Sequence, residues 1–234
     1  MTSFQLSGEP ETPVGPIRRQ WNALITYLEE NRQQIVYLLL FFVLCAMLFA
    51  ERYFIYSYLN EHQDLRHVMG PFIALTRGSA AALSFCYALL LLTMSRNLLT
   101  RLRETSLHQY IPIDSHVVFH KIVAMTALIF SLLHAAGHLV NFLHISQQSH
   151  EHLKCLGIFF HSDAKPNFAH YIFYTVPGAT GIALYALVCL IFIFAHWKVR
   201  TKAFAQFWSV HQLYIIFYAL TLLHGMAKLT GVCV

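Results

Sequence analysis

Charged side chains are scarce in this sequence. Only 12% of its 234 residues are Asp, Glu, Lys or Arg, whereas 57% are hydrophobic, and the mean hydropathy is +0.52. This balance excludes an ordinary soluble domain and is typical of a polytopic membrane protein. The net charge of +5 is divided among short basic clusters at the ends of apolar runs, so no nucleic-acid-binding surface is expected.

Several motifs that carry a known chemistry are missing as well. The five cysteines form neither a CxxC pair nor a spacing typical of zinc ligands, and there is no CxxCH for covalent haem attachment. The sequence contains no Gly-rich dinucleotide-binding motif and no EF-hand loop. Cys45, Cys86 and Cys189 lie within apolar runs, where we expect them to be small buried hydrophobic residues.

Long apolar runs dominate the rest of the chain, and each is long enough to cross a hydrocarbon core of about 30 Å. We therefore expect an all-α membrane protein, a helical bundle of five transmembrane helices. The predicted spans are about 35–57, 71–95, 116–145, 171–196 and 206–228. Residues 1–34 are expected to form a cytosolic leader and an interfacial amphipathic helix that includes Trp21 to Gln34. A sixth span is expected beyond Val234 if a catalytic domain follows.

The basic clusters predict the orientation of these spans. They precede the first span and follow the second and the fourth, and they all lie on the cytosolic side if the first span runs outward. The N-terminus is then cytosolic, and the third and fifth spans run outward as parallel helices. The residues concerned are Arg18, Arg19, Arg32, Arg96, Arg101, Arg103, Lys198, Arg200 and Lys202.

Histidine pairs mark the third and fifth spans. His120 and His134 are 14 residues apart, and His211 and His224 are 13 apart, which separates the rings of each pair by about 20 Å along a helix. In parallel helices, His120 lies beside His211 and His134 beside His224. Imidazoles that face each other across a helical bundle are typical ligands of haem iron. The sequence therefore predicts a transmembrane di-haem domain in residues 35–234, with two b-type haems.

The 13-residue spacing poses a geometric difficulty. At about 100° per residue, 14 positions bring His120 and His134 to within about 40° of one face, whereas 13 positions leave about 140° between His211 and His224. The fifth helix must therefore be tilted, twisted or locally irregular if both of its rings are to face the same partner.

Two further polar residues lie inside the predicted spans. His138 follows His134 by one turn on the same face, where it either supports the outer haem from nearby or is simply buried. Arg77 lies within the second span, where a charge needs a partner. That partner is a haem propionate, an anionic product or Glu51.

The segment between the third and fourth spans is rich in histidine. Its histidines indicate either an extracellular metal site or a solvated loop. They are His144, His150, His152, His161 and His170, and Cys155 lies among them.

Several segments resemble the haem-bearing membrane domain of NADPH oxidases, over nearly everything from the first span to Gly225. They are FHKIVAMTALIFSLLHAAGHLVNF, the TVPGATG bend and FWSVHQLYIIFYALTLLHG. The dual oxidase branch is the most similar, through FAERYF, TRGSAAALSF and LTMSRNLLTRLRETSLHQYIPID. The resemblance implies that one pair of histidines binds the cytosol-side haem and the other pair the outer haem, and that the oxygen site includes Arg77 and His138. The pair on the cytosol-side haem is His120 with His211, and the pair on the outer haem is His134 with His224.

The resemblance also implies cofactors and partners that this sequence does not itself contain. FAD and NADPH belong to a cytosolic domain, oxygen is the electron acceptor, and superoxide and hydrogen peroxide are the products. A plasma-membrane location and a dual oxidase maturation factor as a partner are implied in the same way. We expect the chain by itself to be inert towards NADPH.

Two other functions compete with this one. A ferric-chelate reductase would use the same di-haem scaffold, and the histidine-rich segment favours it, whereas TRGS and Arg77 favour oxygen as the acceptor. A haem-free membrane subunit that stabilises a partner belongs to a different class and is distinguished at once by an absorption spectrum. A transporter is disfavoured, because the intramembrane histidines have no carboxylate relay beside them.

Overall fold

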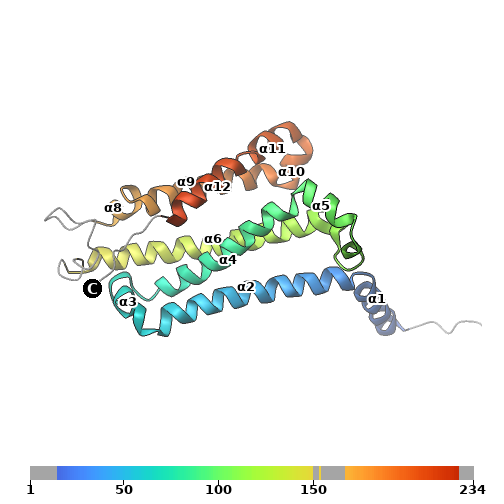
Figure 1. Ribbon diagram of the computed structural model, residues 1–234, viewed down its shortest axis with the longest axis horizontal. Helices are drawn as coiled ribbons and strands as arrows, with labels where there is room; N and C mark the ends of the chain where they lie inside the picture. The colour runs from blue at the N-terminus through green and yellow to red at the C-terminus, as the bar shows by residue number, and fades with distance from the viewer. Residues whose placement is uncertain (1–14, 150–152, 154–166, 227–234) are drawn as a thin grey trace, which may run out of the picture.

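The computed structural model describes residues 15–149, 153 and 167–226. Regular structure in these residues is helical, and the long helices run side by side along one axis (Figure 1). The expected all-α membrane fold is confirmed. Four helices are long and apolar enough to cross a membrane, namely Arg32–Tyr58, Ile73–Thr93, Ile113–Gln147 and Val176–Ala195. Outside the described residues lie most of the leader, His150, His152, Cys155, His161 and the predicted end of the fifth span.

The amphipathic helix at the N-terminal end is α1, Pro16–Glu30, which begins before the predicted Trp21. Proline is well suited to its first turn, because the N–H that proline lacks would have no partner there. Asn31 separates α1 from α2, Arg32–Tyr58, and the Asn31 side-chain amide donates to the carbonyl of Tyr27 at 2.9 Å. No residue of α1 is buried, and its exposed apolar side chains include Ile17, Trp21, Leu24, Ile25 and Leu28.

Helix α4, Ile73–Thr93, packs between α2 and α6, His116–Gln147. Glycines allow this close approach. A Cβ atom on Gly78 would lie 2.9 Å from the carbonyl oxygen of Phe49 on α2, and one on Gly137 would lie 2.6 Å from Cγ2 of Thr76. The core between the three helices consists of Phe41, Cys45, Leu83, Cys86, Val123 and Ala127.

Burial of cysteine is therefore confirmed at two of the three positions where the sequence predicts it. Cys45 and Cys86 face each other from α2 and α4 with their sulfur atoms 3.9 Å apart. Cys189 is exposed on α9, and the expectation is wrong there. The apolar run around Cys189 has no polar face that could show from the sequence which side packs inward.

At one end of the bundle, η1 (Asn60–His62) and α3 (Gln63–Met69) connect α2 to α4. Arg66 closes the C-terminus of α2 by donating to the carbonyls of Tyr56 at 3.1 Å and Leu59 at 2.8 Å. Gly70 ends α3 with a φ of 94°, a left-handed conformation that glycine adopts readily.

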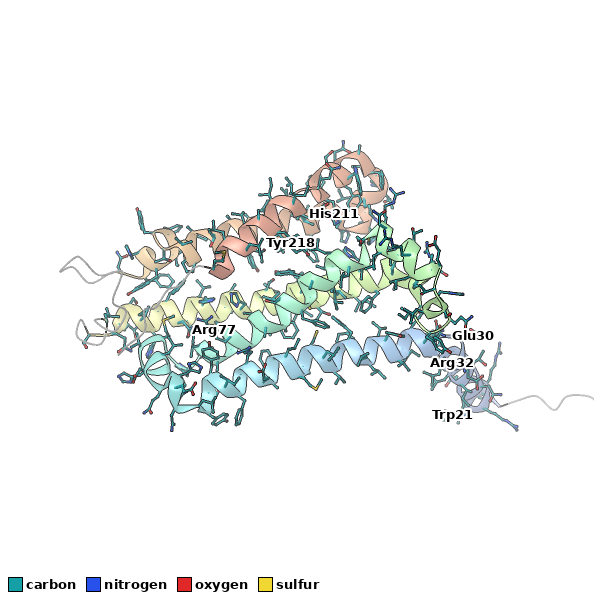
Figure 2. All side chains as sticks on the ribbon, in the orientation of Figure 1. Trp21, Glu30, Arg32, Arg77, His211 and Tyr218 are labelled. Atoms are coloured by element: carbon teal, nitrogen blue, oxygen red, sulfur yellow. The ribbon has the colours of Figure 1, made fainter. Side chains whose placement is uncertain are left out.

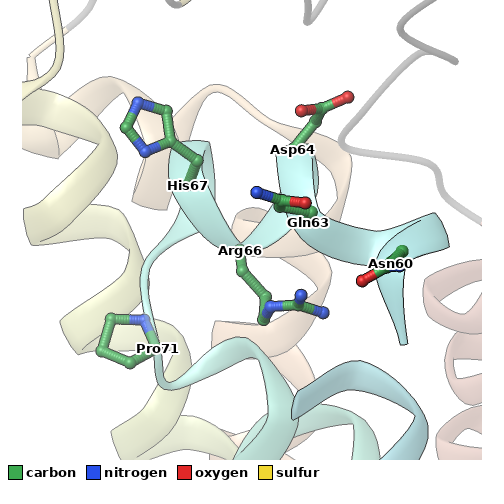
Figure 3. A pocket seen from close by; sticks show the side chains of 6 residues that line it. All are labelled: Asn60, Gln63, Asp64, Arg66, His67 and Pro71. Atoms are coloured by element: carbon green, nitrogen blue, oxygen red, sulfur yellow. The ribbon is translucent and has the colours of Figure 1, made fainter. Parts of the chain in front are cut away.

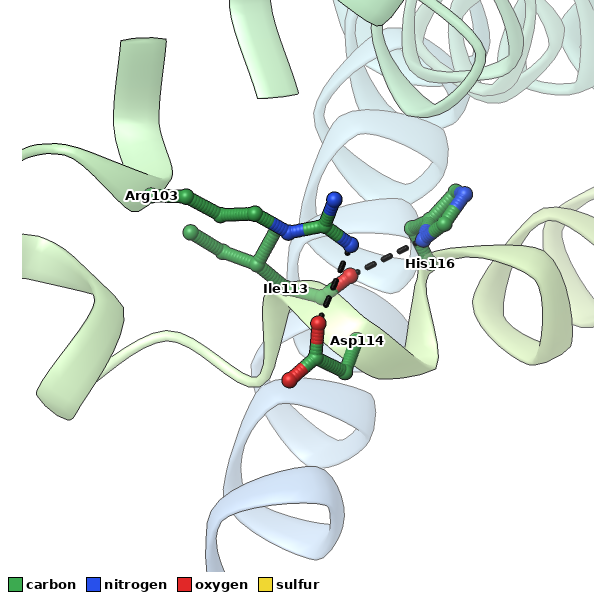
Figure 4. Close-up of polar contacts among 4 residues, drawn as sticks. All are labelled: Arg103, Ile113, Asp114 and His116. Atoms are coloured by element: carbon green, nitrogen blue, oxygen red, sulfur yellow. Dashed lines mark hydrogen bonds and ion pairs between the residues drawn. The ribbon is translucent and has the colours of Figure 1, made fainter. Parts of the chain in front are cut away.

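At the other end, α5 (Arg96–Arg103), η2 (Ser106–Gln109) and η3 (Ile113–Ser115) connect α4 to α6. Arg103 donates to a carboxylate oxygen of Asp114 at 3.0 Å, and the Nδ1 atom of His116 donates to the carbonyl of Ile113 at 3.0 Å (Figure 4). Gln33 and Gln34 on α2 bind this connection by hydrogen bonds to Gln109 and Ser115.

The predicted fourth span is divided near its start. A short helix, α8 (Phe168–Phe173), ends before a bend at Tyr174 and Thr175, and α9 runs from Val176 to Ala195. The bend therefore precedes the long helix, and Pro177 lies in the first turn of α9, where proline interrupts no helical hydrogen bond. The Thr175 side chain caps α9 by accepting from the N–H of Gly178 at 3.2 Å.

The predicted fifth span is also divided into two helices. After α10 (Trp197–Lys202), α11 runs from Phe204 to His211 and α12 from Tyr214 to Met226, and both pack against α9. With 8 and 13 residues, each is shorter than the roughly 20 residues that a single spanning helix needs. The hairpin formed by α9 and α12 lies along the side of α6 that faces away from α2 (Figure 1).

Candidate haem-binding site

Two pairs of histidine rings face each other between α6 and the hairpin. His120 on α6 and His211 at the end of α11 have ring centroids 6.4 Å apart, with 63° between the ring planes. His134 on α6 and His224 on α12 have centroids 6.1 Å apart, with 67° between the planes. These are the two pairs that the parallel orientation of the helices predicts.

The distance within each pair fits a shared metal ion. Since a metal lies about 2 Å from a ligating imidazole nitrogen, and that nitrogen about 1 Å from its ring centroid, two imidazoles on opposite sides of one ion have centroids about 6 Å apart. Both pairs have this separation, 6.4 Å and 6.1 Å. The donor set also fits haem iron, because neutral imidazoles are common protein ligands of haem and His120 with His211 or His134 with His224 would supply two of them.

A break between α11 and α12 brings both rings of the predicted fifth span towards α6. His211 is the last residue of α11, Gln212 and Leu213 form a turn, and α12 begins at Tyr214. In this turn the N–H of Leu213 donates to Val210 and that of Ile215 to Gln212, at 3.0 Å and 3.2 Å. These i to i−3 bonds wind the chain more tightly than an α-helix. The irregularity that the 13-residue spacing requires is therefore present.

His134 and His224 form the pair that the predicted orientation puts on the outer side, here called the outer pair, and His120 with His211 is called the inner pair. In the outer pair, Nδ1 of each histidine has a hydrogen-bond partner. Nδ1 of His134 donates to the backbone carbonyl of Thr76 at 3.0 Å. Nδ1 of His224 lies 2.9 Å from the hydroxyl of Thr180 on α9. Hydrogen bonds of this kind orient the ring of a metal-ligating histidine and leave Nε2 for the metal.

In the inner pair, only one of the two rings has a hydrogen-bond partner at Nδ1 among the described residues. Nδ1 of His120 lies 2.9 Å from the hydroxyl of Thr93 at the end of α4. Nδ1 of His211 is buried and has no hydrogen-bond partner among the described residues. The two pairs thus share a ring separation but differ in how the surrounding helices hold the rings.

Comparison with known proteins identifies the family of this chain. Residues 78–222 match the family described as the ferric reductase like transmembrane component. The chain belongs to this family. In the part of the chain that the structure describes, four helices are long and apolar enough to cross a membrane, and the matched family is a transmembrane component, so the chain is an integral membrane protein.

Three dual oxidases are among the relatives of this ferric reductase-like chain. It is 56% identical over 233 residues to the dual oxidase of Drosophila melanogaster, a match that covers 99% of the chain and 15% of the relative. Identity is 49% over 205 residues with dual oxidase 1 of Caenorhabditis elegans, covering 87% and 14%, and 38% over 203 residues with human dual oxidase 2, covering 85% and 13%. The chain spans about one seventh of the length of these relatives. The resemblance to the dual oxidase branch is confirmed.

The other two predicted site residues of this ferric reductase-like domain lie near its outer pair. The ring centroid of His138 is 4.5 Å from that of His134, and its Nδ1 atom is buried without a hydrogen-bond partner among the described residues. The guanidinium carbon of Arg77 lies 5.3 Å from the ring centroid of Tyr56 (Figure 2 labels Arg77). Glu51 forms its ion pair with Arg52 instead, at 3.5 Å, so pairing with Arg77 is not observed.

A separate hollow opens at the end of the bundle where α3 lies. Its volume is about 640 Å³, and its lining is polar (Figure 3). The residues around it are Asn60, Gln63, Asp64, Arg66, His67 and Pro71. None of the predicted site residues lines this hollow, so the histidine pairs and the hollow are different features of the ferric reductase-like domain.

The threonine partners of the histidines could not be recognised from the sequence. Thr76, Thr93 and Thr180 stand in apolar runs like the other threonines of the spans. A threonine in a membrane helix usually bonds to its own preceding turn, and its sequence position does not show whether its oxygen also reaches a neighbouring helix.

Proposed function

We propose that this chain carries electrons across the membrane through two b-type haems, as the transmembrane core of an NADPH oxidase of the dual oxidase type. The main support is the pair of facing histidine rings at each of two depths, 6.4 Å and 6.1 Å apart. His120 and His211 would hold the inner haem, and His134 and His224 the outer one. When bound, a haem takes up and passes on one electron at a time.

The electron acceptor in this proposal is oxygen, which reacts beside the outer pair to give superoxide and hydrogen peroxide. His138 lies against His134, and Arg77 is on the same helix as Thr76, whose carbonyl accepts from His134. Arg77 is exposed and lies against Tyr56, whereas Nδ1 of His138 is buried. A cation and a ring nitrogen close to a developing anion stabilise it, and more strongly where water is excluded. We therefore assign Arg77 and His138 to the oxygen site.

The electron donor is a cytosolic domain that carries FAD and NADPH. Its docking region in this proposal is the end of the bundle where α1, α5 and α10 lie together (Figure 1). Basic residues gather on these helices, as the positive-inside rule predicts for a cytosolic face. They are Arg18, Arg19, Arg96, Arg101, Arg103, Lys198, Arg200 and Lys202.

The same orientation places the N-terminus in the cytosol and the apolar side chains of α1 in the lipid interface, with residues 35–234 as the transmembrane di-haem domain. A plasma-membrane location and a dual oxidase maturation factor as a partner complete the proposal, and both rest on the similarity to dual oxidases.

A ferric-chelate reductase is the second candidate, because the matched family takes its description from ferric reductases. The scaffold and the haem ligands would be the same, and only the acceptor differs. Reduced protein mixed with either oxygen or a ferric chelate distinguishes the two: the acceptor that reoxidises it faster is the one to which the outer site is adapted.

The absorption spectrum of the purified chain tests the proposal directly. We expect two b-type haems per chain, both six-coordinate and low-spin, reduced by dithionite and reoxidised by air, with no reduction by NADPH. A chain that folds into the membrane and retains no haem would contradict the proposal and favour a haem-free membrane subunit.

A further inference from the structure

Thr93 stands at the end of α4 with two hydrogen bonds to its side-chain oxygen. Its hydroxyl donates to the carbonyl of Leu90, one turn earlier, at 3.0 Å. The same oxygen lies 2.9 Å from Nδ1 of His120 on α6. Thr93 is therefore bonded at once to its own helix and to a histidine of the inner pair.

Thr180 repeats this arrangement on a different helix and at the other depth. Its hydroxyl donates to the carbonyl of Val176, one turn earlier on α9. The same oxygen lies 2.9 Å from Nδ1 of His224 on α12. Two threonines that are far apart in the sequence thus make the same two bonds, one at each histidine pair.

The direction of the bond to histidine follows from proton counting. A threonine hydroxyl has one hydrogen to donate, and both of these hydrogens are used on backbone carbonyls. Towards the ring, the oxygen can only accept. With the hydroxyl hydrogens arranged in this way, Nδ1 of His120 and of His224 carries the ring proton. The lone pair of each neutral ring is then on Nε2, the atom that would bind a metal.

We propose that Thr93 and Thr180 are positioning residues of the two haem sites, which hold His120 and His224 in the tautomer that ligates through Nε2. This inference rests on the proposed function, since it concerns the haems assigned there. The other two rings are held differently: His134 donates to the backbone carbonyl of Thr76, and His211 has no partner among the described residues. A side-chain substitution can therefore test one ligand of each haem.

These hydrogen bonds should also influence the midpoint potentials of the haems. An acceptor at Nδ1–H draws the proton away from the ring and makes Nε2 a stronger electron donor, which favours ferric over ferrous iron. Removing the acceptor should therefore shift the midpoint potential of that haem to a more positive value. Because each threonine contacts one pair only, each substitution should move one haem and leave the other unchanged.

The test is an anaerobic redox titration of the haem-loaded full chain with Thr93→Val or Thr180→Val. Valine keeps the shape of threonine but has no hydroxyl, and Thr93→Ser or Thr180→Ser restores the oxygen. Thr126→Val and Thr221→Val are matched controls, because these hydroxyls also donate to a carbonyl one turn earlier but have no hydrogen bond to a histidine within the described part of the chain. In a His134→Ala background, where we expect no outer haem, the potential that remains belongs to the inner haem.

We expect a positive shift of the inner potential with Thr93→Val, a positive shift of the outer potential with Thr180→Val, and parental potentials in the serine variants and the controls. Loss of one haem alone, restored by serine, also supports the inference, because such partners typically contribute 10–100-fold to metal affinity. Parental potentials in both valine variants, or equal shifts in the controls, would overturn it. Absence of haem from the parent chain would instead refute the proposed function.

Discussion

The hydroxyl of Tyr218 on α12 donates a 2.7 Å hydrogen bond to the backbone carbonyl of Tyr87 on α4. Tyr218 lies between His211 and His224 in the sequence, so this bond joins the hairpin to the three-helix bundle between the two histidine pairs (Figure 2 labels Tyr218 and His211). The ring of Phe217 packs against that of Tyr87 in the same place, with centroids 5.1 Å apart.

Tyr218→Phe should lower the stability of the chain without removing haem. The substitution deletes one partly buried hydrogen bond, which is worth about 1 kcal/mol. Thermal unfolding followed through the haem absorption would show a lower midpoint, whereas Tyr214→Phe, whose hydroxyl makes no hydrogen bond among the described residues, should not change it. An equal effect of both substitutions would show that the Tyr218 hydroxyl contributes nothing specific.

The histidine pairs predict which substitutions have the same effect. His120→Ala and His211→Ala should each remove the inner haem, and His134→Ala and His224→Ala the outer one, because each variant would lack one of the two histidines that would hold that haem. Haem content and the reduced spectrum of the four variants check this. If two substitutions from different pairs, such as His120→Ala and His224→Ala, removed the same haem, the ring contacts would not correspond to shared metal ions.

Arg77→Ala should slow the reoxidation of the reduced protein by oxygen, by roughly 100-fold if Arg77 contributes as a fixed charge in an oxyanion site does. Haem content should stay at the parental level, as it should in His138→Ala. Arg52→Ala is the matched control, since Arg52 is exposed like Arg77 but pairs with Glu51. If Arg77→Ala loses haem, the residue has a structural role instead.

His134→Ala should leave the inner haem reducible by dithionite but slow to reoxidise in air, because the outward route for its electrons is cut. Stopped-flow mixing with oxygenated buffer measures the rate. Reoxidation at the parental rate would mean that oxygen reacts at the inner haem, and the outward order of the two sites would be wrong.

Gly137→Ala should destabilise the bundle by about 1–3 kcal/mol, the usual cost of overpacking a core. The new Cβ atom would lie 2.6 Å from Cγ2 of Thr76, a stiff side chain on the facing helix, whereas a Cβ atom on Gly15 meets nothing within 4 Å. Thermal unfolding of Gly137→Ala and Gly15→Ala compares the two. Equal stability of both would show that α4 and α6 are not in tight contact at this point.

The parts of the fold that follow from one-dimensional patterns could be predicted from the sequence. The lengths of the apolar runs locate the four long helices. The basic clusters, together with the histidine spacing, indicate which rings face each other. The break at Gln212 and Leu213 could be inferred only as a geometric necessity, because the local sequence HQLYII contains neither the proline nor the glycine that usually marks a kink.

Details that depend on contacts between helices could not be predicted. The TVPGATG motif does not itself show where the helix begins, which is after Thr175, whose side chain caps α9 and leaves Pro177 in the first turn. The bonds from Thr93 and Thr180 to the histidine rings depend on where neighbouring helices lie, and no periodicity in the sequence carries that information.

The continuity of α6 and the division of its partner have unequal effects on the two metal sites. His120 and His134 lie on one unbroken helix, so the number of residues between them fixes their separation along the helix axis at about 20 Å. His211 and His224 lie on two short helices joined by a turn, so the angle between these helices can change. In the proposed di-haem core, a single helix therefore sets the distance between the two sites, whereas the angle of each opposing ring can be adjusted without altering that distance.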